Sequence, residues 1–257
     1  MIICSVSTIP DRSLDFIRTL DELLLSTIVP DFIYVSISKF YPRLNKSHTE
    51  NELNQIKLKL ETYPIPNLII CYDNDIGPCS KLLTPLSQKK YNDEDCIIIM
   101  DDDNGLFPTA IECLISGYRS YGKESVYGIM GTIGSGDSTN FVHGELVHGG
   151  YYPVDLLGGY RGVLYPGNLI EYNSLLDWVN KFIEEYSRYG MIPDHDDSIF
   201  SEYLKYKKIE SRVVPVHPNN ILNYWPKENK NGIFQDNKLD KSLSIFHNTL
   251  KKLHGSK

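Results

Sequence analysis

The chain has 257 residues, of which 41% are hydrophobic and 23% are charged, and its formal net charge is −7. This composition is close to that of an ordinary globular protein, and it excludes collagen-like, low-complexity and wholly disordered chains. The negative charge gives no electrostatic reason to bind nucleic acid or an anionic membrane surface. No apolar run approaches the roughly 18 residues of a membrane helix, and the cysteines lack metal-site spacing. We therefore expect a cytoplasmic protein without a transmembrane segment.

The first hundred residues alternate between strand patterns and helix patterns. Short apolar runs predict four strands, at Ile2–Ser7, 32–37, 68–72 and Cys96–Met100. Helical spacing and a capping box predict the helices between them, at 14–28, 49–60 and 78–86. Short apolar strands separated by helices indicate an α/β fold whose parallel sheet is covered on both faces.

The pattern changes after Phe107. A helix is predicted at 108–118, a strand at 126–130 and a mobile Gly/Ser-rich loop at 131–140. Residues 143–162 are dense in Gly and Tyr and predict a loop or hairpin region that forms a pocket wall. Beyond them the sequence predicts helices within 168–189 and 197–206, a strand at 212–216 and a short amphipathic segment at 239–253.

Three of the first four predicted strands end in unusual polar turns, at 8–12, 73–78 and 101–103. The carboxyl ends of parallel strands lie at one edge of a sheet, and ligands of such folds bind there. The three turns together therefore predict a binding site at this edge.

Asp101, Asp102 and Asp103 directly follow an apolar strand. Adjacent carboxylates repel one another unless a cation lies among them, and hard divalent ions prefer oxygen ligands. The alternation of side chains at a strand exit is expected to place Asp101 and Asp103 on one side and Asp102 on the other. The run predicts a Mn²⁺ or Mg²⁺ site completed by substrate phosphates.

The strand followed by D-x-D at 97–103 resembles the metal- and nucleotide-binding signature of GT-A-fold glycosyltransferases. Residues 7–12 are similar to an S-T-I-P-x-R turn that opens one family of these enzymes, and residues 75–82 to its D-x-G-P-x-x-K-L segment. Residues 155–165 resemble its D-x-x-x-G-Y-x-G-V-x-Y segment, and Asp196-Asp197 stands where it has an acidic pair opening a late helix. The matches follow the family order across residues 1–217.

This resemblance implies a single GT-A-type, Rossmann-like domain at 1–218, with a mostly parallel central sheet flanked by helices. Residues 1–105 would bind the nucleotide sugar, residues 106–218 would hold the acceptor and the catalytic groups, and 219–257 would be a tail with a short helix. The implied reaction moves a sugar from a nucleoside-diphosphate sugar, with a UDP-sugar favoured, to a hydroxyl acceptor such as a glycan. The expected stereochemical outcome is inversion.

The resemblance also implies roles for individual residues. Asp197 would be the catalytic base with Asp196 supporting it, and Asp103, Asp101 and His217 would hold Mn²⁺ or Mg²⁺. The residues expected to contact the donor are Thr8, Ile9, Pro10, Arg12, Asp75, Gly77, Pro78, Lys81, Asp101, Asp102, Gly159, Tyr160 and Arg161.

Simpler structural roles stay open at several of these positions. Lys81 can be a surface lysine whose stem covers apolar surface, and Arg161 an exposed arginine in a flexible turn. Asp196 and Asp197 can be an N-cap and a first-turn charge.

Two other functions also stay open. A haloacid-dehalogenase-like, Mg²⁺-dependent phosphotransferase carries a similar strand with D-x-D-G, although about a hundred residues precede it here. A non-catalytic nucleotide-sugar-binding domain on the same fold would bind the donor without turnover.

Overall fold

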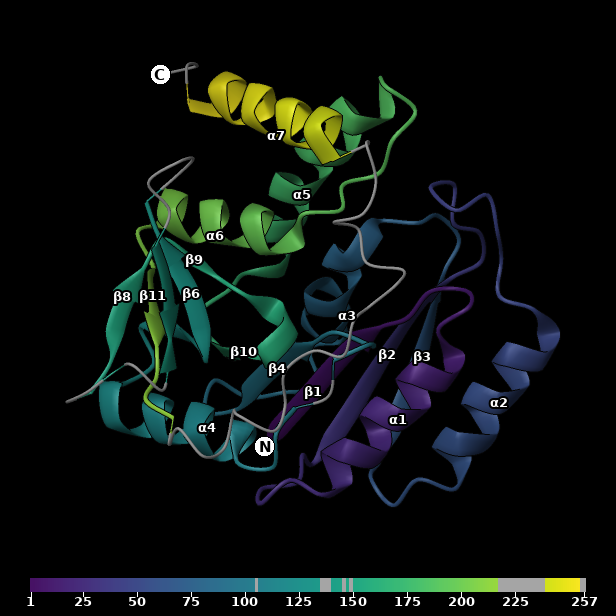
Figure 1. Cartoon of the computed structure of the whole chain (residues 1–257), viewed down its shortest axis with the longest axis horizontal. Coiled ribbons are helices and arrows are strands. Elements are labelled where there is room, and N and C mark those ends of the chain that lie inside the picture. The colour runs from purple at the N-terminus through teal and green to yellow at the C-terminus, as the bar shows by residue number, and fades with distance from the viewer. Residues whose placement is uncertain (105, 135–139, 145–146, 148–149, 217–238, 255–257) are drawn as a thin grey trace.

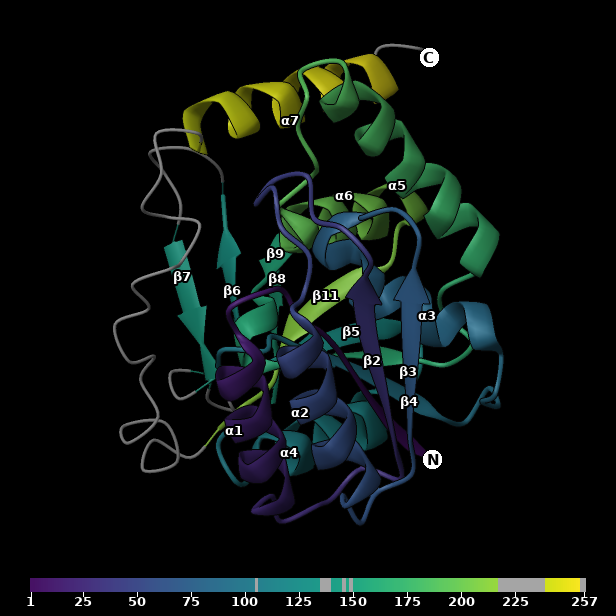
Figure 2. The same cartoon turned by 90° about the vertical axis from the view of Figure 1, so that its right-hand side faces the viewer.

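The computed structural model describes residues 1–104, 106–134, 140–144, 147, 150–216 and 239–254. Within these residues the strands form an eight-stranded sheet and a three-stranded sheet. Figures 1 and 2 show helices on both faces of the larger sheet, with the first four strands running side by side. The predicted α/β fold class is confirmed.

The first half of the chain alternates strands and helices, as predicted. Its elements are β1 (Ile2–Ser7), α1 (Ser13–Leu24), β2 (Phe32–Ser38), α2 (Glu50–Glu61), β3 (Asn67–Tyr72), the 3₁₀ turn η1 (Gly77–Cys79), α3 (Ser80–Gln88) and β4 (Cys96–Met100). The predicted capping box at α2 is present, because Thr49 and Glu52 bond each other's backbone N–H.

The second half mixes short strands with longer helices. Its elements are α4 (Ala110–Tyr121), β5 (Ser125–Gly128), β6 (Met130–Ile133), β7 (Asn140–His143), β8 (Tyr152–Val154), β9 (Leu156–Leu157), η4 (Gly159–Arg161), β10 (Val163–Pro166), α5 (Tyr172–Ser187), α6 (Asp196–Lys207), β11 (Glu210–Val213) and α7 (Leu239–His254).

The strand order of the large sheet is β3-β2-β1-β4-β10-β5-β11-β8. The first four strands are parallel, and β11 is parallel to β5, whereas β10 and β8 run antiparallel to their neighbours. Strand β1 lies between β2 and β4, and Val6 pairs with Val35 on one side and Met100 on the other. The polar turns after β1, β3 and β4 therefore leave the sheet at the same edge.

Both faces of the sheet are buried. In β4, Ile98 and Met100 face the cluster formed with α1, α2 and α4, while Ile97 and Ile99 face the cluster formed with α3, α5 and α6. This alternation follows from the two-residue period of a strand. Burial on both faces explains why the first strands are continuous apolar runs.

Two predicted elements differ in the structure. The strand predicted at 126–130 is split, because at Ile129 the chain leaves the large sheet and continues as β6 in the three-stranded sheet β7-β6-β9. Residues 131–133, predicted as loop, are therefore part of a strand. Helix α1 ends at Leu24 and not near Ile28, since the next two backbone N–H groups bond to carbonyls three residues earlier, which tightens the last turn.

Helix α7 confirms the helix predicted in the tail, and it packs against α5 (Figures 1 and 2). The rings of Phe246 and Phe182 stack with centroids 5.5 Å apart. Lys252 Nζ lies 2.5 Å from Glu185 Oε1 at the other end of the contact. Among the described residues, no helix combines the length and apolar character needed to cross a bilayer.

Candidate active site

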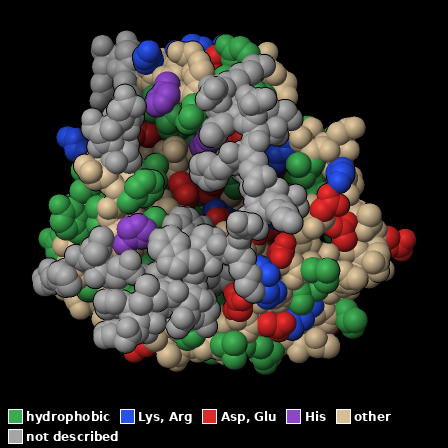
Figure 3. Space-filling view, viewed as in Figure 1, with side chains coloured by type: hydrophobic (Ala, Val, Ile, Leu, Met, Phe, Trp, Pro, Cys, Tyr) green, Lys and Arg blue, Asp and Glu red, His purple; other side chains and the backbone are tan. Residues whose placement is uncertain are grey.

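The polar turns after β1 and β4 contact each other at the edge of the sheet. The Thr8 hydroxyl donates to Asp102 Oδ2 at 2.8 Å, and both side chains are buried. Figure 3 shows Asp and Glu side chains gathered at a hollow in the middle of the molecular face seen in Figure 1. The predicted convergence of strand exits is thus present.

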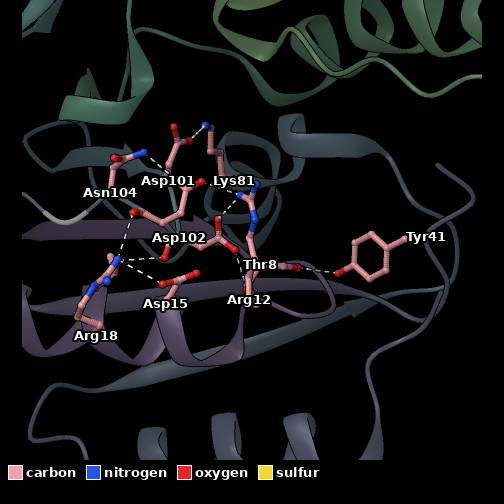
Figure 4. A network of polar contacts seen from close by, with 11 residues as sticks. Thr8, Arg12, Asp15, Arg18, Tyr41, Lys81, Asp101, Asp102 and Asn104 are labelled. Atoms are coloured by element: carbon pink, nitrogen blue, oxygen red, sulfur yellow. Dashed lines mark hydrogen bonds and ion pairs between the residues drawn. The ribbon is translucent and has the colours of Figure 1, made fainter. Parts of the chain in front are cut away.

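Arg12 joins the first turn to the aspartate run. Its Nη1 lies 3.1 Å from Asp102 Oδ1 and 2.9 Å from Asp103 Oδ2, and Figure 4 shows Thr8, Arg12 and Lys81 pointing toward this run. Burial raises the pKa of Asp102 to about 6, although the Arg12 charge opposes this. With Thr8 and Arg12 as partners, Asp102 anchors the β1 turn to β4.

The expected alternation of the three aspartates does not hold. Asp102 and Asp103 meet the same guanidinium, whereas Asp101 Oδ1 lies 2.5 Å from Lys81 Nζ. The reason is that β4 ends at Met100 and the chain bends directly after it, so the aspartate side chains do not alternate as they would along a strand. Asp101 is the most open of the three, with 31% of its side chain exposed against 10% for Asp103.

Lys81 is buried at the centre of the site, so it is not the surface lysine that its sequence context also allowed. Its Nζ contacts Asp101 and lies 2.8 Å from Asp196 Oδ2. Burial by itself lowers the pKa of Lys81, but the charges of Asp101, Asp196 and Asp197 outweigh it and hold the pKa well above its usual value. One permanent cation therefore joins the aspartate run to the acidic pair of α6.

The acidic pair opens α6, as predicted. Asp196 is buried beside Lys81, and Asp197 is partly exposed. The Gly159 backbone N–H donates to Asp197 Oδ2 at 3.0 Å. Burial, followed by the charge of Asp196, raises the pKa of Asp197. The Gly159 amide holds one carboxylate oxygen in place, and the raised pKa makes the ionised group a stronger proton acceptor than an exposed aspartate.

Two glycines of the predicted motifs are required by close contacts. A Cβ on Gly159 would lie 2.6 Å from Asp197 Oδ1, so a side chain there would displace the carboxylate. Gly77 has φ +68°, and a Cβ on it would lie 2.4 Å from the Pro193 carbonyl oxygen. Gly77 thus brings η1 against the segment that precedes α6, and Pro78 occupies the first turn of η1.

The turns after β1, β2 and β3 enclose a small polar pocket. Asp75 Oδ1 accepts from the Gly77 N–H at 2.9 Å, while Asp75 Oδ2 and Arg43 Nε are buried, 3.9 Å apart, and without a hydrogen-bond partner. The pocket is lined by Ser7, Thr8, Ile9, Ser36, Ser38, Tyr41, Arg43, Asp75, Gly77 and Ser80.

The contribution of β2 to this pocket was not predicted from the sequence. The turn after β2 carries Tyr41 and Arg43, and this combination of a hydroxyl and a guanidinium at a fourth strand exit was the available signal. Tyr41 donates to the Thr8 carbonyl at 2.7 Å and accepts from the Ser38 N–H at 2.8 Å. It thereby fixes the β1 and β2 turns to each other.

The remaining predicted residues are placed as follows. Pro10 is buried within the β1 turn. Arg161 is buried, with 5% of its surface exposed, so the alternative of an exposed arginine in a flexible turn is wrong. Tyr160 lies in η4, and its side chain is outside the described part of the chain, as is His217.

The donor set suits a hard divalent cation. Asp101, Asp102, Asp103, Asp196 and Asp197 bring five carboxylates, and the contacts above give them Arg12 and Lys81 as counter-charges. The remaining negative charge favours a further cation. In the described residues no three acidic, His or Cys side chains already form a metal cluster. Two carboxylates completed by substrate phosphates are a common Mg²⁺ arrangement, so the residues fit such an ion.

Neither a scan of protein-family profiles nor a search of curated proteins finds a sequence match. Among solved structures, GalNAc-T7 with UDP, GalNAc and Mn²⁺ has a TM-score of 0.61 at 10% identity, covering 84% of this chain and 42% of that one. The mannosyltransferase PcManGT from Pyrobaculum calidifontis with GDP-Man and Mn²⁺ has a TM-score of 0.49 at 12% identity, covering 84% and 55%. The Francisella tularensis 2-C-methyl-D-erythritol 4-phosphate cytidylyltransferase (IspD) has a TM-score of 0.46 at 13% identity, covering 86% and 91%.

The chain thus spans about half the length of the first two proteins. At 10% identity, the likeness to GalNAc-T7 shows a shared fold and confirms the fold class expected from the sequence resemblance.

Proposed function

We propose that this protein is a metal-dependent glycosyltransferase that moves a sugar from a UDP-sugar to a hydroxyl of a glycan or another acceptor, with inversion. The observation that carries the proposal is Lys81, which joins two acidic groups from distant parts of the chain in one site. The first group follows a central strand and the second opens α6, which is the arrangement a donor site beside a catalytic base requires.

The donor diphosphate is proposed to lie over Asp101 and Asp103. These carboxylates would hold Mn²⁺ or Mg²⁺, with His217 as a further ligand outside the described residues. The bound ion would supply Lewis-acid stabilisation of the departing nucleoside diphosphate. Arg12 and Lys81 keep the carboxylates oriented before the donor arrives.

Asp197 is proposed as the general base. Its Oδ2 is held by the Gly159 amide, which leaves Oδ1 to accept the proton of an acceptor hydroxyl. The hydroxyl oxygen then bonds to the anomeric carbon as the bond from that carbon to the diphosphate oxygen breaks. Attack opposite the leaving group inverts the anomeric configuration without a covalent enzyme intermediate. Asp196 stays paired with Lys81 and orients its neighbour.

We propose uracil as the donor base, with its edge against the polar groups at the mouth of the pocket between the strand exits, since the pocket itself is too small to hold a base. Uracil offers one N–H donor flanked by two carbonyl acceptors. Asp75 Oδ2 and Arg43 Nε form an ion pair at 3.9 Å, and neither atom has a hydrogen-bond partner. Leaving such buried groups unpaired costs stability, so a ligand that pairs both is favoured. Cytosine lacks the ring N–H from which Asp75 would accept a hydrogen bond.

A thermal-shift panel of nucleotide sugars with Mn²⁺, Mg²⁺ or EDTA tests the donor class. A ligand that binds only the folded state raises the midpoint by mass action, so a UDP-sugar should raise it with metal and not with EDTA. Product analysis with a panel of hydroxyl acceptors then tests transfer. Binding without transfer would favour the non-catalytic domain, and release of phosphate from phosphomonoesters would favour the phosphotransferase.

Calorimetry with UDP, CDP and GDP tests the base assignment in the presence of Mn²⁺. UDP should bind tightest, and Asp75→Asn should lose most of the preference for UDP over CDP because the amide can both donate and accept. A preference of the wild-type protein for GDP would contradict the uracil assignment.

A further inference from the structure

The segment that leads into α6 is held from two sides. Gly77 packs against the Pro193 carbonyl from the side of η1. On the other side lies α7, which crosses above α5 and α6 in Figure 1. Helix α6 itself has no side-chain cap, because the His195 side chain bonds no backbone N–H of the first turn. Its N-terminal position therefore depends on what holds the segment from outside.

Ser242 provides the contact from α7. Its side chain is fully buried, and its hydroxyl donates to Asp194 Oδ1 at 2.5 Å. Asp194 Oδ1 also lies 3.3 Å from His195 Nε2. Asp194 is two residues before Asp196, so a hydroxyl on the C-terminal helix reaches a side chain adjoining the acidic pair.

Ser242 is itself held in place by α5. The Tyr186 hydroxyl donates to the Ser242 carbonyl at 2.9 Å, and the Ser242 hydroxyl lies 3.3 Å from the Tyr186 oxygen. The stacked rings of Phe182 and Phe246, described above, fix α7 one turn further along. The contact to Asp194 thus comes from a rigid helix pair and not from a free side chain.

We propose that Ser242 is a positioning residue, which through Asp194 sets the place of the α6 N-terminus and hence of Asp197 over the acceptor hydroxyl. This inference rests on the proposed function, because it assigns a role in the same transfer reaction. Small displacements of a base cost rate because proton transfer needs hydrogen-bond contact with the acceptor. The Ser242 hydroxyl bonds Asp194 and none of the residues proposed to bind the donor, so donor affinity should change little without it.

The test compares Ser242→Ala with Ser244→Ala, an exposed serine on the same helix. Ser242→Ala should lower kcat about tenfold, leave the donor KM within about twofold, and speed amide hydrogen exchange in residues 194–199. Ser244→Ala should change none of these. A Ser242→Ala protein that matches Ser244→Ala, or that exchanges faster at unchanged kcat, would overturn the proposal.

A double-mutant cycle separates positioning from a general packing role. If Ser242 acts through Asp194, then Asp194→Ala should also lower kcat, and the double variant should lose no more than the single ones. Additive losses would overturn the proposal. Asp194→Ala carries the same test if Ser242→Ala does not fold.

The failure of the proposed function would look different. A wild-type protein without transfer in any donor and acceptor combination would refute the transferase, and with it the catalytic part of the inference. If the wild-type protein does transfer sugar but Ser242→Ala leaves amide hydrogen exchange in residues 194–199 unchanged, only the role of Ser242 is refuted.

Discussion

The two sides of the candidate site are held together differently. On the donor side, side chains from the turns after β1 and β4 pair directly with one another, as Arg12 does with Asp102 and Asp103. On the catalytic side, Asp197 is placed by a backbone amide of Gly159 and by packing of the segment before α6. The donor side is therefore held by ion pairs between its own side chains, whereas the catalytic side is held by a backbone amide and by packing.

Lys81 is the point where the two sides meet. It comes from α3, beside the donor-side turns, and contacts Asp196 of the catalytic pair. Donor binding and proton abstraction should therefore be separable by substitution, except at this lysine and at the contact between Gly77 and Pro193.

The largest expected effect is on turnover. Asp197→Asn keeps the shape of the side chain but removes the base, so turnover should fall by a factor of about 10²–10⁴ while the affinity for UDP and Mn²⁺ stays the same. Transfer assays and calorimetry measure the two quantities, and Asp177→Asn, at an exposed position on α5, is the control. Near-normal turnover, or a product of retained anomeric configuration by NMR, would contradict the assignment.

Removing Lys81 should damage both sides at once. Lys81→Met leaves Asp101 and Asp196 without their shared buried cation, and breaking a buried pair in this way costs about 3–5 kcal/mol of unfolding free energy. Urea unfolding at neutral pH measures the loss, and addition of Mn²⁺ should restore part of it.

The control for this loss is Lys39→Met, which breaks an exposed ion pair with Asp73. Solvent screens that pair, so the midpoint of urea unfolding should not move measurably. Equal stability of the Lys81 and Lys39 variants would show that Lys81 does not hold the two sides together.

The pH dependence of stability includes a donor-side contribution from Asp102. Burial raises the pKa of Asp102 to about 6, so between about pH 4 and pH 6 the folded protein keeps a proton that the unfolded chain has released. Stability should therefore fall as pH rises through this window, by at most about 1.4 kcal/mol per pH unit. Urea unfolding without metal checks this, and Asp102→Asn should make the dependence less steep, with the part due to the acidic pair of α6 remaining. The same slope in that variant would assign it to other groups.

The smallest expected effect isolates the contact between the two sides. Gly77→Ala puts an alanine into a left-handed backbone conformation and its Cβ against the Pro193 carbonyl. Gly190→Ala causes the same backbone strain, at φ +66°, but no atom lies within 4 Å of the added Cβ. The unfolding free energy should fall further for Gly77→Ala than for Gly190→Ala, by about 1–3 kcal/mol. Equal losses would show that the segment before α6 adjusts freely.

Much of the donor side could be predicted from the sequence. The apolar runs of β1 and β4 and the polar turns after them are local patterns, and parallel strands bring their carboxyl ends to one edge. The capping box of Thr49 and Glu52 is local for the same reason. The alternation expected for Asp101 and Asp103 failed because it assumed that the strand continues past Met100.

The sequence by itself determined the strands and helices of the first half of the chain, apart from the end of α1, and the chemical groups that follow the strand ends, because these depend on residues close together in the chain. Only the tertiary structure decided the burial of Lys81 and Arg161, the pocket that Arg43 and Asp75 share, and the bond from Ser242 to Asp194. Each of these depends on segments that are distant in sequence. Their contact requires the whole sheet and its helices to pack, and no local pattern specifies that.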